Sequence, residues 1–364
     1  MLTRLYVDNY RCLVNCEARF SRLQLLLGPN GSGKSSLFEA LRQVRGLLDG
    51  APLAATFPTT CLTQWQTSPL QRVEVGLELD GRAFAYALAI EHDKPRRRAR
   101  ITSETLTCDG APLFSFEGGE VQLYRDDHSA GPQYPFDWSR SALATISERQ
   151  DNALLTAFRR DIARTVIVAP APIVMSEMSS GPVERLDRHM ENVVAWYQGA
   201  SQDQVLPMRV AEALRPALPG FSHFRFAQTG DQWRLEVEFR GRSGGLTVPF
   251  GQLSDGERML CALYMLAAGC ADGTTICIDE PANYVGLPEI SPWIDLVNDR
   301  CDDGELQAVV ISHHPLWIDR EAASAGLWFD RQPGEPARLA RLTDEPGAGM
   351  PVSELVERGW IGGA

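Results

Sequence analysis

This 364-residue sequence lacks paired cysteines. It has eight cysteines, but none of them form a CxxC motif. Cys12 and Cys16 are four positions apart, but no nearby histidine or second cysteine pair completes a metal-binding set. Cys261, Cys270 and Cys277 stand in apolar surroundings, which is typical of buried thiols. The cysteine pattern therefore predicts neither a disulfide framework nor a zinc hook.

Long hydrophobic runs are also missing. Residues 260–271 form one of the longest apolar stretches, and they are too few to span a bilayer. Residues 1–7 enter directly into an alternating strand pattern without the architecture of a signal peptide. No long heptad array of a coiled-coil arm is present. We therefore expect a cytoplasmic protein with no membrane partner.

Positive charge is scarce, since 35 lysines and arginines face 47 acidic residues for a net charge of −12. This balance disfavours a globally basic nucleic-acid binder, although it permits a local basic patch. Residues 94–100 (KPRRRAR) are the dense basic cluster, between two strand-like runs. They form either the solvated tip of a hairpin or a contact to a phosphate backbone.

A strand, a glycine-rich loop and a helix follow one another near the N-terminus. Residues 21–27 end as an apolar run, residues 28–36 read GPNGSGKSS, and residues 37–48 carry an apolar helical stripe. This is the context that a GxxxxGK[ST] loop requires to bind phosphates. Lys34 is expected to reach the β- and γ-phosphates of ATP, and Ser35 to ligate Mg²⁺. The predicted ATP-binding residues of the loop are Asn30, Gly31, Ser32, Gly33, Lys34, Ser35 and Ser36.

Two adjacent acids end an apolar strand in residues 274–281 (TTICIDEP). Charges at the end of a buried strand need partners. Asp279 fits a carboxylate linked to Mg²⁺, and Glu280 fits the general base that orients the attacking water. The alternative is a solvated turn at the strand end.

Residues 253–257 (LSDGE) precede a strongly apolar helix. As a bare pattern they form a capping box, in which Ser254 caps the helix and Glu257 reaches back to it. A serine and a glycine at a helix start also suit anion binding. Both interpretations stay open from the sequence.

Together these elements resemble the ABC-ATPase superfamily, whose signature motif is LSxGE. The resemblance implies that the signature (Ser254, Asp255, Gly256 and Glu257) acts in trans on ATP held by a second protomer, so that ATP closes a head-to-head homodimer. Lys34 and Ser254 are 254 − 34 = 220 residues apart, which is wider than a transporter ATPase would show.

The branch of the superfamily is indicated by residues 7–11 (VDNYR), 25–36 (LLLGPNGSGKSS), 279–283 (DEPAN) and 311–315 (ISHHP). They are similar to the RecF, SMC (chromosome-maintenance) and OLD (overcoming lysogenization defect) branch, and in particular to OLD-like bacterial AAA-family ATPases. The resemblance covers residues 1–45 and 245–330.

The resemblance carries further roles onto this sequence. His313 would be the catalytic switch histidine that senses the γ-phosphate, with His314 as the alternative. Arg11 would contact the nucleotide, and Asn283 would communicate across the dimer. A Mg²⁺-linked glutamine is expected after a strand; we favour Gln66 over its competitors Gln64 and Gln71.

An OLD-like nuclease domain is not expected in this sequence. About 50 residues follow His314, and their acids have no recognisable spacing. Those acids are Asp319, Asp330, Asp344 and Glu345.

The expected fold is α/β, namely a P-loop NTPase head of ABC type with a mixed sheet core, an antiparallel β lobe and a helical insertion in place of a coiled-coil arm. Residues 1–125 would hold the P-loop and the β lobe, with a tight turn at Asp80-Gly81. Residues 126–245 would be the insertion, mainly helical with short strands, including helices over 141–164 and 182–198. Residues 246–364 would complete the head.

The leading functional hypothesis is a Mg²⁺-dependent ATPase that converts ATP and water to ADP and phosphate. ATP-gated dimerisation would serve DNA repair or recombination, or anti-phage defence. The alternative is a regulatory ATPase sensor that controls a separately encoded nuclease or toxin effector without binding DNA.

Overall fold

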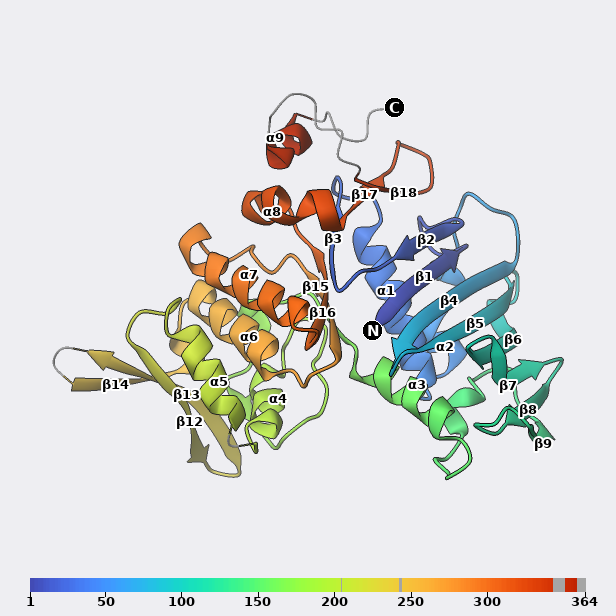
Figure 1. Cartoon of the computed structure of the whole chain (residues 1–364), viewed down its shortest axis with the longest axis horizontal. Coiled ribbons are helices and arrows are strands. Elements are labelled where there is room, and N and C mark those ends of the chain that lie inside the picture. Colours follow the sequence, from blue (N-terminus) through green and yellow to red (C-terminus); the bar gives the residue numbers. More distant parts are fainter. Residues whose placement is uncertain (204, 242–243, 343–350, 359–364) are drawn as a thin grey trace.

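The computed structural model describes residues 1–203, 205–241, 244–342 and 351–358. At its centre is a six-stranded sheet in the order β10-β15-β16-β3-β17-β18, parallel except for the last pair (Figure 1). Its strands come from distant parts of the chain: β3 (Leu23–Leu27), β10 (Val166–Val168), β15 (Thr274–Asp279), β16 (Leu306–Ile311), β17 (Gly326–Asp330) and β18 (Arg338–Arg341).

Helices cover both faces of this sheet, and the alternation of side chains along each strand explains how. Leu26, Cys277 and Val309 pack in one core with α1 (Lys34–Leu48) and α3 (Ala153–Arg164). The alternate positions pack in a second core with α6 (Asp255–Gly269), α7 (Leu287–Asp302) and α8 (Pro315–Ala325). A strand buried on both faces reads as a continuous apolar run, as β16 does.

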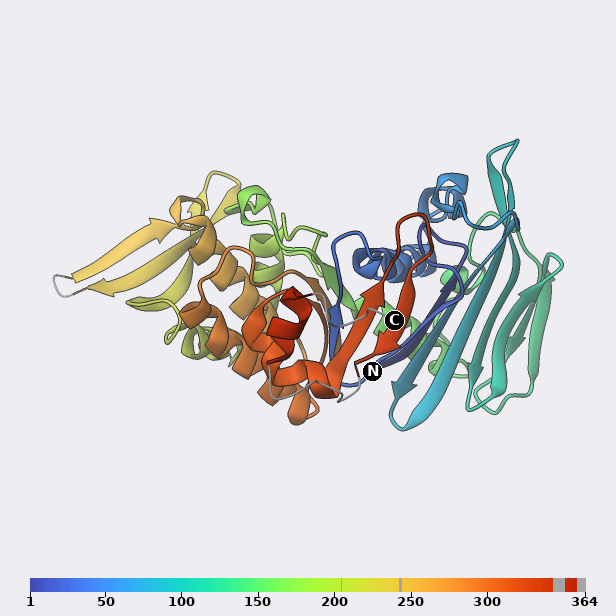
Figure 2. The same cartoon turned by 90° about the horizontal axis from the view of Figure 1, so that it is seen from above.

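An antiparallel sheet of eight strands lies beside the central sheet, in the order β2-β1-β4-β5-β6-β7-β8-β9 (Figure 2). The strands are β1 (Leu2–Asp8), β2 (Cys16–Arg19), β4 (Leu70–Leu79), β5 (Arg82–Asp93), β6 (Arg98–Cys108), β7 (Ala111–Glu117), β8 (Glu120–Tyr124) and β9 (Ala130–Pro135). Short helices α2 (Leu53–Thr56), η1 (Thr59–Cys61) and η2 (Leu143–Thr145) accompany it. The tight turn predicted at Asp80-Gly81 is confirmed, because both residues have positive φ (50° and 74°) and join β4 to β5.

A third, smaller sheet lies at the opposite end of the molecule (Figure 1). β13 (Gln232–Gly241) pairs with β11 (Met178–Ser179), β12 (Phe221–Thr229) and β14 (Gly244–Pro249). With it belong η3 (Pro172–Val174), η4 (Phe250–Gln252), α4 (Val193–Ala200) and α5 (Val205–Leu214), the last packing against α6. The insertion thus carries a sheet as well as helices. α9 (Val352–Glu357) lies against α8.

Two predicted helices are shorter in the structure, for local reasons. The helix expected over 141–164 begins only at Ala153, because the Asn152 side chain accepts from Arg149 N (2.8 Å) and donates to the Ser147 carbonyl (3.0 Å). The helix expected over 182–198 begins only at Val193, because the Asn192 side chain bonds the backbone of Asp187 and Arg185. Side chains that bond nearby backbone compete with helix formation.

Strand pairing crosses the boundaries expected at residues 125 and 245. β9 extends the antiparallel sheet to Pro135, and β10 lies in the central sheet beside β15. Residues 244–249 form one strand, β14, across the second boundary. The three-part division therefore stays an interpretation of the sequence. Residues 343–350 and 359–364, which it places in the last part, lie outside the described residues, as do Asp344 and Glu345.

Candidate nucleotide-binding site

The P-loop lies between β3 and α1, and glycine is required at both of its ends. Gly28 has φ of 133°, and a Cβ there would lie 2.0 Å from the carbonyl oxygen of Phe329 in β17. Gly33 has φ of 114°, and its Cβ would lie 2.9 Å from Cys12 Sγ. Side chains other than hydrogen would therefore be strained and blocked at both positions. The backbone is free to curl around an anion at the start of α1.

Lys34 is held at the centre of this loop. Its Nζ donates to the carbonyl oxygens of Gly28 (2.6 Å) and Pro29 (3.0 Å). Burial lowers the pKa of the ammonium, while the nearby Glu280 and Asp279 carboxylates oppose this shift. Ser32 Oγ is buried in the same loop without a hydrogen-bond partner among the described residues. A bound phosphate would satisfy that hydroxyl, so these groups fit a nucleotide.

Ser35 and Asp279 meet across two elements. Ser35 Oγ, in the first turn of α1, donates to Asp279 Oδ2 at the end of β15 over 2.7 Å. A hydroxyl and a carboxylate so placed are hard oxygen ligands of the kind that Mg²⁺ prefers beside phosphates. The geometry fits the metal roles predicted for both residues.

Glu280 follows directly and adopts a left-handed backbone, with φ of 52°. Burial raises the pKa of its carboxyl to about 7, and Asp279 adds to the rise while Lys34 opposes it. Its Oε1 lies 3.4 Å from His313 Nε2. Burial and the Lys34 charge lower the pKa of His313. A carboxyl with this pKa and a neutral imidazole form a pair suited to handling the proton of a water molecule.

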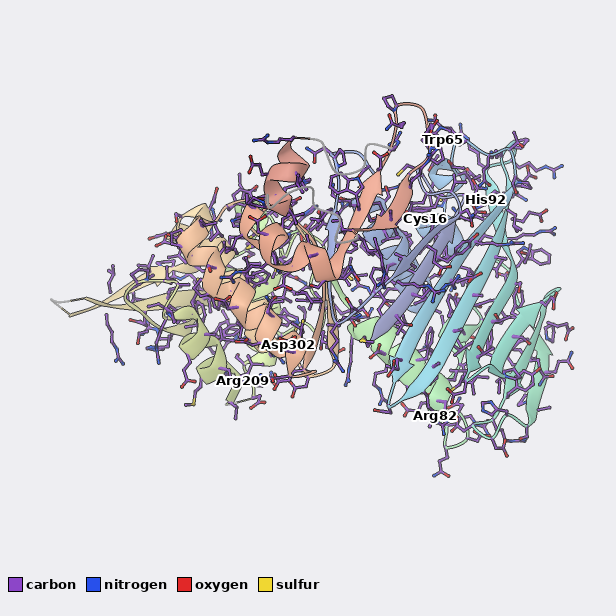
Figure 3. All side chains as sticks on the ribbon, turned by 45° about the horizontal axis from the view of Figure 1, so that its top comes forward. Cys16, Trp65, Arg82, His92, Arg209 and Asp302 are labelled. Carbon is purple, nitrogen blue, oxygen red and sulfur yellow. The ribbon has the colours of Figure 1, made fainter. Side chains whose placement is uncertain are left out.

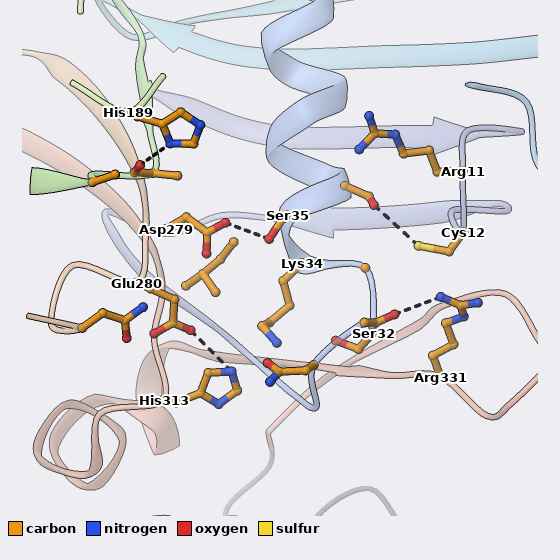
Figure 4. Close-up of a pocket in the computed structure, with 18 of the residues that line it drawn as sticks. Arg11, Cys12, Ser32, Lys34, Ser35, His189, Asp279, Glu280, His313 and Arg331 are labelled. Atoms are coloured by element: carbon orange, nitrogen blue, oxygen red, sulfur yellow. Dashed lines mark hydrogen bonds and ion pairs between the residues drawn. The ribbon is translucent and has the colours of Figure 1, made fainter. Parts of the chain in front are cut away.

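Strand order explains how these residues meet. β15, β16 and β3 are adjacent and parallel, so Glu280, His313 and the P-loop all follow carboxyl ends at one edge of the sheet. They line a cavity of about 800 Å³ (Figure 4). All the predicted P-loop residues line it: Asn30, Gly31, Ser32, Gly33, Lys34, Ser35 and Ser36.

The two adjacent histidines have different positions. His313 lines the cavity, whereas His314 does not and forms the N-cap of α8. His314 Nδ1 is buried without a partner among the described residues, and burial lowers the pKa of its ring. The geometry favours His313 as the switch histidine.

The glutamine choice needs correction. Gln66 does not line the cavity, because its Nε2 donates to Asp8 Oδ1 over 2.9 Å. Gln71 is fully buried and donates to the Asn9 carbonyl. Gln64 lines the cavity and takes the place of Gln66 as the candidate beside the metal.

The cavity lining includes polar and aromatic residues that the sequence did not predict, among them Arg331, Trp65 and His189. Arg331 donates to the Gly31 carbonyl over 3.0 Å, and its guanidinium carbon lies 5.1 Å from the centre of the Trp65 ring. His189, before α4, brings the insertion to the cavity, with Nδ1 2.8 Å from the Ala169 carbonyl. Arg331 follows β17 and reaches the P-loop because β17 pairs with β3. The sequence contains no motif that predicts this strand pairing, so Arg331 could not be predicted. The predicted Arg11 does line the cavity.

The LSDGE segment does not line this cavity, although it contacts a residue that does. Ser254 Oγ accepts from Glu257 N (3.3 Å) and the Glu257 carboxylate accepts from Ser254 N (2.9 Å), so the predicted capping box is formed. Ser254, Asp255, Gly256 and Glu257 are not among the cavity-lining residues. A Cβ on Gly256 would lie 2.9 Å from the carbonyl oxygen of Tyr284, which lines the cavity with Asn283.

The fold and this P-loop site define an ABC-type ATPase head of the OLD/SMC-like branch. A family model described as "AAA domain, putative AbiEii toxin, Type IV TA system" matches residues 25–319, and another described as "AAA ATPase domain" matches residues 1–45. The chain belongs to the first of these families.

A curated relative and two solved structures are similar to the chain. The OLD nuclease of Thermus scotoductus is 24% identical over 351 residues, covering 88% of this chain; the chain spans 60% of that protein's length. An SMC head bound to the C-winged helix domain of ScpA matches 94% of this chain and 98% of its own, with a TM-score of 0.56 and 15% identity. The SMC head with an extended coiled coil from Pyrococcus furiosus covers 99% of both chains, with a TM-score of 0.53 and 12% identity. At such identities these structures report on the fold alone.

Proposed function

We propose that this chain hydrolyses ATP with Mg²⁺ in a site that a second copy completes. The observation that carries the proposal is the placement of Glu280 against His313 at the carboxyl ends of two adjacent strands, facing the P-loop. Lys34 would neutralise the β- and γ-phosphates, while Ser35, Asp279 and Gln64 would hold the metal. Bound Mg²⁺ would supply charge neutralisation on the phosphate oxygens.

Glu280 would orient the attacking water and take its proton, and His313 would report whether the γ-phosphate is present. Ser254 and Gly256 do not line the cavity of their own chain, which supports action in trans. Both residues would then contact the nucleotide bound by a partner. Tyr284 lines the cavity, and its carbonyl lies against Gly256 of the signature. This contact would connect the nucleotide cavity of one chain to the signature surface that contacts the partner's nucleotide.

The test is Glu280→Gln. We expect ATP binding to persist, phosphate release to fall by about 10² or more, and ATP-bound dimers to accumulate. Phosphate release and light scattering with and without ATP measure these effects. Glu117→Gln, an exposed residue on β7, is the matched control. Unchanged turnover in Glu280→Gln would refute the assignment.

For the biological role, we propose nucleic-acid-linked work in repair, recombination or anti-phage defence. The relative named OLD nuclease supports this role. The second candidate is an ATPase that controls a separate effector, which the family description supports by naming a toxin of a type IV TA system. No helix among the described residues has the length and apolar character needed to cross a membrane.

A further inference from the structure

A second large cavity lies at the other edge of the central sheet. It has a volume of about 970 Å³, compared with about 800 Å³ for the nucleotide cavity. It includes Val166 and Thr274, which begin β10 and β15, so it lies at the amino ends of strands whose carboxyl ends face the P-loop. Figure 3 shows Arg209, which lines this cavity, far from Trp65 of the nucleotide cavity.

Arginines from four segments converge on this cavity, although the chain as a whole is acidic. They come from α1, α3, the segment before α4, and α5. The five arginines are Arg45, Arg160, Arg164, Arg185 and Arg209. Three carboxylates also line the cavity: Glu184, Asp203 and Asp272. Asp272 is held by Arg300 (2.8 Å), and Asp203 accepts from Val205 N (2.9 Å), so both are already engaged.

Two of the five arginines, Arg45 and Arg164, have no carboxylate within 4.0 Å among the described residues. Arg164 is exposed at the end of α3 and makes no side-chain hydrogen bond to the described residues, although the Asp161 carboxylate one turn earlier attracts it at longer range. Arg45 donates to the Thr165 carbonyl over 2.6 Å, and burial lowers the pKa of its guanidinium. The nearest acid on its helix, Asp49, is taken by both terminal nitrogens of Arg185. Asp49 therefore offsets the burial of Arg45 only in part, and an anion in this cavity would offset it further.

The opposite wall of the cavity is apolar. Trp196 and Leu206 line it beside Gly269, whose Cβ position lies 3.4 Å from the Trp196 ring. Small-molecule sites combine such walls with a few convergent polar groups, in volumes of roughly 300–1,000 Å³. Arginine is also the side chain best matched to phosphate geometry.

We propose that this cavity is a second ligand site, which binds a phosphate-bearing small molecule between Arg45, Arg164 and the apolar wall of Trp196 and Leu206. The phosphates face the two arginines that have no carboxylate within 4.0 Å. The site is separate from the P-loop cavity, and α1 runs from one to the other, since it begins at Lys34 and carries Arg45 near its end. Ligand binding here does not depend on whether the chain hydrolyses ATP.

The first measurement is the stoichiometry of Mg²⁺ and AMP-PNP on the full chain by isothermal titration calorimetry. Two equivalents, with the weaker one lost in Arg164→Glu, identify the ligand as a nucleotide. If one equivalent binds, tripolyphosphate is titrated into the AMP-PNP-saturated protein. Binding there identifies a ligand recognised through its phosphates alone.

In either case we expect Arg164→Glu to weaken the second binding event at least tenfold, with the affinity falling as salt rises. The matched control is Arg240→Glu on β13, an exposed arginine outside the cavity, which should leave the affinity unchanged. Arg160→Glu is a second variant of the same cavity, should Arg164→Glu fail to fold. The proposal is overturned if neither probe binds beyond one AMP-PNP, or if the cavity and control variants weaken binding equally.

Discussion

Single residues around the nucleotide cavity have properties set by what surrounds them. Glu280 combines a left-handed backbone, a raised pKa and a histidine at 3.4 Å. Behind the loop that carries Arg11 lies a buried network, in which Gln71 bonds both the Asn9 carbonyl and His92 Nε2 (3.1 Å). This network holds the loop through its backbone, so it acts on the position of Arg11.

His92 gives a prediction about pH. It is 3% exposed, and burial, with a smaller contribution from Lys94, lowers the pKa of its ring from 6.5 to about 4. The folded state therefore binds fewer protons than the unfolded state, so this stabilisation is present above pH 6.5 and is lost as the pH falls toward 4. We expect the contribution of His92 to the free energy of unfolding to fall by about 2 kcal/mol between pH 7 and pH 5.

Urea unfolding at the two pH values measures this change. His92→Gln should remove that part of the pH dependence, whereas the exposed His223→Gln should retain it. A His92→Gln protein as pH-sensitive as the parent would contradict the prediction.

The glutamines near the cavity give a second prediction, with its own internal control. Gln64 faces the cavity and Gln66 is bonded to Asp8. Gln64→Ala should lower the rate of ATP hydrolysis about tenfold, or ~1.4 kcal/mol in the activation barrier, because a metal-side contact is lost. Gln66→Ala should change it by less than about twofold. Steady-state phosphate release by the two variants measures this difference. A larger loss of activity in Gln66→Ala than in Gln64→Ala would instead assign the metal contact to Gln66.

At the scale of elements, the start of α6 forms a helix cap and, in our proposal, also serves as the signature segment. α6 begins with a complete capping box, which satisfies backbone groups at its own N-terminus. The same residues form the segment that we propose to contact a partner's ATP. Capping and signature roles are therefore compatible, because capping uses bonds within the segment while its outer surface stays open.

Ser254→Asp separates the two roles. Aspartate keeps the cap, but it cannot donate to the Glu257 carboxylate as Ser254 Oγ does (2.8 Å), so the free energy of unfolding should fall by about 1 kcal/mol. Its negative charge would repel the partner's γ-phosphate, so ATP should still bind while ATP-dependent dimers disappear. Urea unfolding and light scattering read the two effects. Ser254→Ala is the matched control without the charge, with a similar stability cost of about 1 kcal/mol from the lost cap. Persistent ATP-dependent dimers in Ser254→Asp would exclude the trans role.

For the whole molecule, the distribution of charge bears on its partners. The basic cluster lies at the turn between β5 and β6, as the hairpin interpretation predicts. Arg96 pairs with Asp93 and Arg100 with Glu91. Among the described residues, Lys94, Arg97 and Arg98 have no carboxylate partner within 4.0 Å and remain available to a polyanion.

If DNA is a partner, reversing these three charges to glutamate should weaken DNA binding at least tenfold at low salt, both with and without ATP. Anisotropy of labelled duplex DNA across a salt series measures this. Arg240→Glu is a control at another exposed site. Absence of DNA binding by the parent protein at low salt would favour the effector-controlling ATPase instead.

The sequence by itself predicted the local motifs and most of the helices and strands. Three motifs are local patterns that the sequence shows directly: the P-loop glycines, the acids after an apolar strand and the capping box. They cover residues 28–36, 279–280 and 254–257. Alternating runs also predicted the antiparallel strands, because side chains alternate between faces along each strand. Two helices were predicted to begin too early, because side-chain hydrogen bonds to nearby backbone replace helical bonds before Ala153 and Val193.

Only the tertiary structure decided which distant residues share a site. Arg331 reaches the P-loop because β17 pairs with β3, about 300 positions away. Gln64 faces the cavity while Gln66 turns to Asp8, and His313 faces it while His314 starts a helix. The second cavity, with arginines from four segments, has no sequence motif at all. Such choices depend on strand order and on packing between remote segments, which local patterns do not specify.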